Sequence, residues 1–303
     1  MIRRFGAHLG LLVIGAGWGA TVPLGKVAVS TGLPVLGLIT VQLIIGALFM
    51  GGILILRRAP IRLPMDWPAL RIYALVAALG TLLPNSASYT AAAHLPAGIL
   101  SVLIATVAMF SFPICLIVGL DRFSWRRLLG LALGLVSVVL LAQPASDGAF
   151  GSGAIFYMAL SMCAALLYAF EGISVALLRP DGLGPMRLLF GSSALGALIC
   201  LPAALQTGAL AQVTSEFGVP QQALVASSII HICVYAGYVA LVGRAGAVFA
   251  AQVSYVVTAS GVIWAMIMLG ERFSPWFWAA LCLMLVGMAM VQPRPKEDTP
   301  AAP

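Results

Sequence analysis

Polar and ionisable side chains recur at helical spacing inside otherwise apolar stretches of this chain. In the segment 223–243, four of them follow steps of three, four and three residues: Ser228, His231, Tyr235 and Tyr238. Such steps place all four on one face of a helix. A polar face is costly against hydrocarbon, so it must hydrogen-bond to another helix or face a wet cavity.

Two further segments show the same kind of pattern. Segment 153–178 carries four polar residues on one helical face: Tyr157, Ser161, Tyr168 and Glu171. Segment 247–269 offers Gln252 and Tyr255, three residues apart. For serine and threonine we favour simple helix-to-helix hydrogen bonding. The Tyr, Trp and His rings combine an apolar face with a polar tip, which suits either a dry helix contact or a cavity for amphipathic small molecules.

Glu171 is the only carboxylate well inside an apolar segment. An ionised carboxylate near the middle of a bilayer costs about 2.5–3.5 kcal/mol on insertion scales, so the group must pair, take up a proton or touch water. One interpretation is that it snorkels to the interface near Arg179, eight residues later. The other is that it loads and releases a proton, because a lone carboxyl in a low dielectric favours its neutral form. Glu171 is therefore our proton-coupling candidate.

Lys26 is the only base inside an apolar segment, near the end of 8–28 that we place outside the cell. Its ammonium either snorkels to the interface or serves as an anion anchor for a carboxylate or phosphate. The predicted depths of Lys26 and Glu171 lie in opposite leaflets, so we predict no direct salt bridge between them.

Nothing in the sequence indicates catalysis or metal binding. It contains no HExxH, GxSxG or phosphate-loop motif. The three histidines lie on three different segments, and the five cysteines lie inside apolar segments without a CxxC pair. We therefore expect no catalytic residues, no metal and no cofactor.

The elements that position these residues are transmembrane helices. Hydrophobic residues make up 62% of the 303 residues and charged residues 8%, against about 25% charged in a soluble domain. A membrane helix needs roughly 20 apolar residues. Ten segments meet this need: 8–28, 36–56, 69–91, 98–119, 125–142, 153–178, 186–206, 223–243, 247–269 and 275–292. The predicted fold is an all-α membrane protein with ten transmembrane helices, in contact with the lipid bilayer.

The net charge of +7 is a topology signal rather than evidence for nucleic-acid binding. If ten helices alternate, fourteen of the sixteen Lys and Arg residues fall on one side, and Arg272 alone lies in a loop on the other. The positive-inside rule then places both termini in the cytoplasm. In a bacterium this predicts a multi-pass protein of the cytoplasmic (inner) membrane.

The chain contains an internal repeat. Asp121-Arg122-Phe123-Ser124 matches Glu271-Arg272-Phe273-Ser274 at an offset of 150 residues, and each match lies between two apolar segments. Five helices per half is an odd number, so the halves insert in opposite directions as inverted repeats. We predict a first repeat over 1–142, a linker over 143–152, a second repeat over 153–292 and a disordered cytoplasmic tail over 293–303.

The repeat also relates the polar faces to one another. The offset maps His231, Tyr235 and Tyr238 onto Thr81, Asn85 and Ser88, and it maps Tyr168 and Glu171 onto Trp18 and Thr21. Both halves therefore carry a polar stripe at the same place. We predict a central cavity formed by the following residues: Trp18, Asn85, Tyr168, His231, Tyr235, Tyr238, Gln252 and Tyr255.

The repeat resembles the EamA-like domain of the drug/metabolite transporter superfamily. That domain occurs twice per chain and usually ends in Leu-Gly-Glu, a short turn and a Gly-rich helix; Leu269-Gly270-Glu271 fits, whereas Leu120-Asp121 departs from it. The resemblance implies a secondary transporter, most often an exporter of amino acids or related metabolites. We expect the protein to act as a monomer or homodimer. Uptake of a vitamin or nucleotide-like compound is the alternative, followed by a lipid-modifying enzyme or an accessory subunit.

Overall fold

The computed structural model contains helices and turns throughout the part of the chain that it describes, which is residues 2–146, 153–245, 247–250 and 252–291. The predicted tail lies outside these residues, as does most of the predicted linker. The start of that linker is helical, because the preceding helix continues to Ser146.

The first half contains eight elements: α1 (Ile2–Val29), α2 (Val35–Leu56), α3 (Trp67–Ala77), the π-helical segment η1 (Ala78–Leu82), α4 (Leu83–His94), α5 (Ala97–Ile104), α6 (Thr106–Ile117) and α7 (Trp125–Ser146). The second half contains seven: α8 (Ala154–Leu178), α9 (Pro185–Gln206), α10 (Ala209–Thr214), α11 (Val219–Ala245), α12 (Ala247–Ala250), α13 (Val253–Leu269) and α14 (Pro275–Val291).

Within the described residues, eight helical stretches are long and apolar enough to cross a membrane. They correspond to the first eight predicted segments. The remaining two, α13 and α14, are apolar but have 17 residues each. At 1.5 Å per residue such a helix is about 26 Å long, slightly less than the hydrocarbon thickness of roughly 30 Å.

Two predicted segments are interrupted where we expected continuous helices. Segment 98–119 divides into α5 and α6 at Ala105, and segment 247–269 divides into α12 and α13. Both interruptions contain a backbone hydrogen bond between residues three apart. Ala108 N donates to Ala105 O at 3.3 Å, and Tyr255 N donates to Gln252 O at 3.2 Å. Both halves thus break their fourth apolar segment, within a few residues of related positions.

A third irregularity, η1, lies inside the third apolar segment. Pro84 has no N–H to donate to the carbonyl of Gly80, four residues earlier, so the regular helical ladder cannot continue there. The chain widens to a π-helical turn, in which Leu83 N donates to Ala78 O. Such turns are frequent at functional sites.

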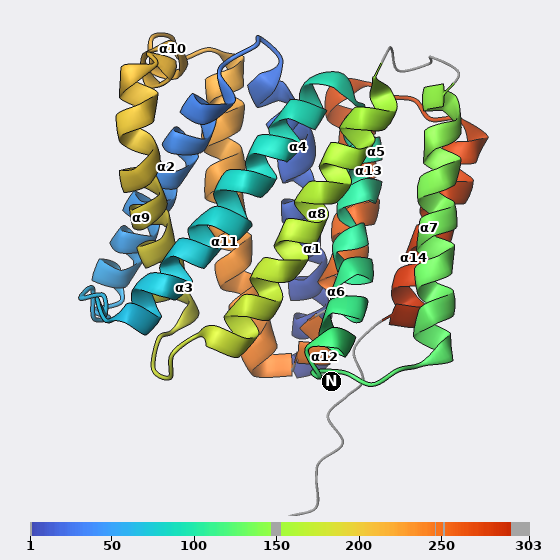
Figure 1. Cartoon of the computed structure of the whole chain (residues 1–303), viewed down its shortest axis with the longest axis horizontal. Helices are drawn as coiled ribbons and strands as arrows, with labels where there is room; N and C mark the ends of the chain where they lie inside the picture. The colour runs from blue at the N-terminus through green and yellow to red at the C-terminus, as the bar shows by residue number, and fades with distance from the viewer. Residues whose placement is uncertain (1, 147–152, 246, 251, 292–303) are drawn as a thin grey trace, which may run out of the picture.

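The two halves interlock rather than lie side by side. Helix α1 packs on α11 and α13 of the second half, and α8 packs in return on α4 and α6 of the first half. Helices α2 and α9 pair along one edge of the molecule, while α7 and α14 pair along the opposite edge (Figure 1). Every one of these contacts joins an element of one repeat to an element of the other.

Small residues permit the close approach of α7 and α14. A Cβ added to Gly130 would lie 2.7 Å from the carbonyl oxygen of Gly287, and a Cβ on Gly287 would lie 2.7 Å from that of Gly130. The Ser137 hydroxyl donates to the Ala280 carbonyl at 2.7 Å. The small residues of α7 and α14 therefore form a backbone-to-backbone contact, as membrane helices commonly make.

We expect Gly287→Ala to destabilise the protein, because the added methyl group must push two helix backbones apart. Overpacking of this kind costs about 1–3 kcal/mol. Gly52→Ala is the matched control, since Gly52 is also helical and a Cβ there meets nothing within 4 Å. Thermal unfolding of the purified protein in detergent measures both. A Gly287→Ala protein that melts at or above the temperature of Gly52→Ala would contradict the proposed contact.

Candidate substrate cavity

A cavity of about 760 Å³ lies in the middle of the helical bundle. Its wall includes residues of α1, α2, α4 and α6 from the first half and of α8, α11 and α13 from the second. Its volume falls within the 300–1,000 Å³ that is usual for small-molecule sites. Both helix breaks contribute to the wall, through Ile104 and Ala105 in one half and Ala250 and Val253 in the other.

One side of the cavity is an aromatic cluster centred on Trp18 of α1. Its indole N–H donates to Nδ1 of His231 at 3.1 Å. The ring centroids of His231, Tyr238 and Tyr235 lie 5.5, 5.9 and 6.4 Å from that of Trp18, all in edge-to-face arrangements. Such pairs are favourable beyond simple burial, so α11 and α1 hold these four rings in fixed positions.

The opposite side is a hydrogen-bonded chain that joins three helices. The Tyr168 hydroxyl donates to Oδ1 of Asn85 at 2.7 Å, and Asn85 Nδ2 donates to Oε1 of Gln42 at 2.9 Å. The same Gln42 oxygen accepts from the Tyr89 hydroxyl at 3.0 Å. Both polar atoms of the Asn85 amide are thereby satisfied, which fixes its orientation.

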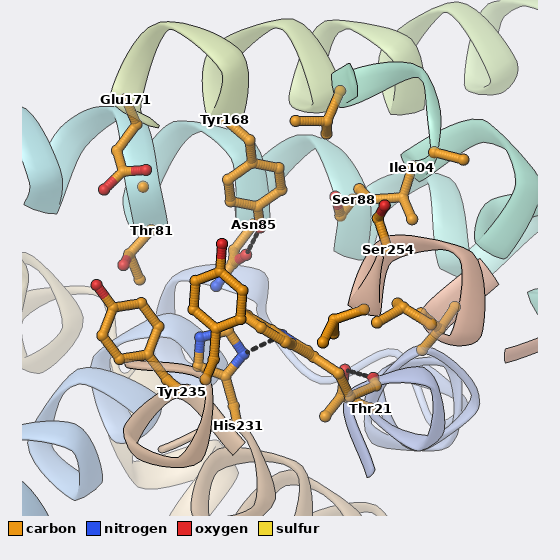
Figure 2. A pocket seen from close by; sticks show the side chains of 18 of the residues that line it. Thr21, Thr81, Asn85, Ser88, Ile104, Tyr168, Glu171, His231, Tyr235 and Ser254 are labelled. Atoms are coloured by element: carbon orange, nitrogen blue, oxygen red, sulfur yellow. Dashed lines mark hydrogen bonds between the residues drawn. The ribbon is translucent and has the colours of Figure 1, made fainter. Parts of the chain in front are cut away.

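Glu171 projects from α8 into the cavity, with its carboxylate facing Thr81 and Tyr235 (Figure 2). It makes no hydrogen bond or ion pair with another described residue. The side chain lies over η1, where a Cβ on Gly80 would stand 3.1 Å from Cγ of Glu171. The glycine of the π-helical turn therefore makes room for the carboxylate.

The cavity wall includes residues close to both ends of the molecule. At the end where α1 begins (Figure 1), the wall includes Asp121, which forms an ion pair with the buried Arg127. At the opposite end, the charged side chains of Glu271 and Lys26 hold the junction between α4 and α5. Oε1 and Oε2 of Glu271 accept from the backbone N–H groups of Ala97 and Gly98 at 2.7 and 2.9 Å.

Lys26 is the second charged residue that hydrogen-bonds to the backbone at the α4–α5 junction. Its Nζ donates to the carbonyl oxygens of Ala92 and Leu95 at 3.0 and 2.5 Å, and Glu271 acts on it electrostatically. The ring of Phe273 also packs against Gly98 so closely that a Cβ there would overlap it. Lys26 is not part of the cavity wall and does not contact Glu171. It binds the end of α4, and its role as an anion anchor stays a prediction.

The structure brings most of the predicted cavity residues together. The predicted residues in the wall are Trp18, Asn85, Tyr168, Glu171, His231, Tyr235, Tyr238 and Tyr255. Gln252 is the exception, since it is exposed and lies outside the wall. Its spacing from Tyr255 suggested a shared face, but that rule applies within a continuous helix, and Gln252 precedes the first residue of α13. Tyr157 also lies elsewhere, stacked on His94 with centroids 3.8 Å apart.

Gln42 was missing from the predicted cavity although it connects Asn85 to Tyr89. It has no periodic partner, because it is the only strongly polar residue in segment 36–56. The sequence does contain one signal for Gln42, because a lone primary amide inside a membrane helix needs a hydrogen-bond partner.

The fold and the cavity define a multi-pass membrane protein with a largely apolar chamber that carries several polar side chains and is lined by both halves. The comparison with protein families agrees: the EamA-like transporter family matches residues 5–143 and again residues 155–292. The chain belongs to the EamA-like transporter family, within the drug/metabolite transporter superfamily.

Comparison with solved structures adds support for the fold alone. A crystal structure of another protein superposes with a TM-score of 0.63 at 15% sequence identity, covering 94% of this chain and 97% of the other. No curated protein matches the sequence significantly.

Proposed function

We propose that this chain is a secondary transporter that exports a small metabolite, an amino acid or a related compound, across the bacterial cytoplasmic membrane by alternating access. The observation that carries the proposal is the central cavity, which is lined by both repeats and contains fixed polar and aromatic side chains. A substrate between two repeats can be exposed to either side by small movements of one repeat against the other.

The loop charges supply the orientation in this proposal. Fourteen basic residues on one side support a cytoplasmic location for both termini and, with five helices per half, inverted repeats. Asp121 then lies at the cytoplasmic end of the cavity, and the hydrogen bonds from the Ala97 and Gly98 amides to Glu271 lie at the external end. In this proposal the contacts of Glu271 with Ala97 and Gly98 close the external end of the cavity, which suits the loading step of an exporter.

Asn85 is the residue we expect transport to need most among the uncharged ones, because it connects Tyr168 to Gln42 across the cavity. Asn85→Leu leaves the Tyr168 hydroxyl without its acceptor and removes one of the two donors to Gln42 Oε1, at a cost of about 1–3 kcal/mol. We therefore expect transport to fall by about tenfold or more. Ser86→Ala, at the exposed neighbouring residue, is the matched control and should retain transport.

The experiment has two stages. Extracellular metabolites are compared between cells that overproduce the protein and cells that overproduce Asn85→Leu, and each compound that differs is then tested for flux in proteoliposomes. The expected result is accumulation outside the cell for the parent and Ser86→Ala only. If the compound moves at the same rate without protein, or through Asn85→Leu as fast as through the parent, the cavity is not the transport site. Net flux into the cell would support the uptake alternative.

A further inference from the structure

The charge of the cavity wall is one-sided. Among the described residues that form it, the ionisable acids are Glu171 and Asp121, and there is no Lys or Arg. Asp121 is compensated by its ion pair with Arg127, whose side chain is 3% exposed. Glu171 is therefore left as the cavity's uncompensated acidic group.

The basic side chains around the cavity do not form an ion pair with Glu171. Arg179 acts electrostatically on Tyr235, but no ion pair joins it to Glu171 among the described residues. Nδ1 of His231 accepts the hydrogen bond from the Trp18 indole, which can only donate. An imidazole with an accepting nitrogen is neutral. Lys26 is engaged by the carbonyl oxygens of Ala92 and Leu95 at the far end of the molecule.

The groups around Glu171 suit a cation with an apolar body. Tyr168 and Tyr235 lie close enough to interact with its carboxylate electrostatically, and Figure 2 shows Tyr235 and Tyr168 on either side of the space it faces. The edge-to-face cluster around Trp18 begins at Tyr235. Electron-rich ring faces attract ammonium groups, most strongly where water is excluded.

We propose that the cavity selects small organic amines in their cationic form, with the ammonium against Glu171 and an aromatic or branched apolar body against the rings of Trp18 and Tyr235. This rests on the proposed function, in which the cavity is the substrate site. It narrows the expected amino acid or related compound to an amine that carries no carboxylate.

The expected preference for amines over carboxylates follows from the absence of Lys and Arg among the described wall residues. The carboxylate of an amino acid would enter the cavity without a cation to receive it, and it would also meet the charge of Glu171. Leaving a buried charge unpaired is among the strongest means of rejecting a ligand. A neutral alcohol of the same shape avoids that penalty but loses the attraction to Glu171. The expected order of affinity is amine, then alcohol, then zwitterion and anion.

Four probes that share one phenyl body test this order: 2-phenylethylamine, 2-phenylethanol, phenylalanine and 3-phenylpropionate. Binding to the purified protein in detergent is followed by calorimetry at neutral pH. We expect the amine to bind about tenfold or more tightly than the alcohol, and the other two to bind more weakly than the alcohol. Glu171→Gln should bring the amine to within about threefold of the alcohol, whereas Glu216→Gln, at an exposed carboxylate, should change nothing.

The alcohol also serves as a folding control, because it should bind Glu171→Gln as it binds the parent. Phenylalanine or phenylpropionate binding as tightly as the amine would overturn the charge assignment, as would an unchanged amine preference in Glu171→Gln, or failure of all four probes to bind. These outcomes leave the proposed function standing. That function fails separately, if no metabolite shows protein-dependent flux.

Discussion

Glu171→Gln should abolish transport driven by a pH gradient while substrate exchange continues at saturating substrate. The carboxylate faces the cavity without a hydrogen bond or ion pair to another described residue, so a proton is the simplest partner that can neutralise it in the membrane. Glutamine keeps nearly the same shape and cannot titrate. The exchange reaction should show a higher half-saturating concentration, because the variant lacks the charge that we expect to hold an amine.

The measurement uses proteoliposomes with and without an imposed pH gradient, loaded with the substrate found in the metabolite comparison. The position related to Glu171 by the repeat is the uncharged Thr21, so one half alone would carry the coupling group. Glu216→Gln controls for the removal of a carboxylate at an exposed site. If Glu171→Gln accumulates substrate against its gradient with the parent's pH dependence, then Glu171 is not the coupling residue.

Glu271→Ala should open the end of the cavity where Glu271 holds the α4–α5 junction. The substitution removes both acceptors of the Ala97 and Gly98 amides and leaves Lys26 without its nearest carboxylate. Hydrogen bonds to a charged group contribute about 1.5–3 kcal/mol each. A loss of that size shifts an equilibrium between two conformations by about tenfold to a hundredfold.

Thiol labelling reports the change. Leu100 is buried, lies one turn inside α5 and forms part of the cavity wall. With the native cysteines replaced, Leu100→Cys should react at least about tenfold faster with an impermeant reagent from the Glu271 side once Glu271→Ala is present. Asp121→Ala, at the related position of the other repeat, should not raise that rate. An unchanged rate in a folded Glu271→Ala protein would show that another contact closes this end.

Hydropathy located the membrane segments because each is a continuous apolar run. Most helix ends in the structure lie within a few residues of the predicted segment ends. Composition could not locate the interruptions at Ala105 and before Val253, because no proline or glycine marks the first of them and both stretches stay apolar. Pro84 is the residue that marks the interruption in the third apolar segment. Its effect appears one turn earlier, in Ala78–Leu82, because the missing N–H leaves the preceding carbonyl free.

The residues of the candidate site could be predicted where polar side chains recur at helical spacing. The stripes on α8 and α11 follow helical steps, and the repeat offset carried them onto Trp18 and Asn85. What sequence could not supply was the pairing between helices. The engagement of Lys26 with α4 and the bonds from Glu271 to α5 join residues 66–174 positions apart, and no local pattern encodes such contacts.

The exchange of first helices between the halves has a consequence for the biogenesis of the protein. Helix α1 ends at Val29, but its packing partners α11 and α13 begin at Val219 and Val253. During synthesis α1 therefore enters the bilayer long before the surface it will cover has been translated. Its Gly15 and Gly19 form a groove that fits Val256 and Gly261 of α13, and these partners have not yet been translated when α1 is inserted.

Such long-range contacts delay folding, because their closure entropy is lost before they contribute any stability. The N-terminal repeat consequently cannot reach its final packing while it waits on the ribosome. Assembly must wait for the last third of the chain, which makes the nascent, half-translated protein the form most exposed to membrane quality-control proteases.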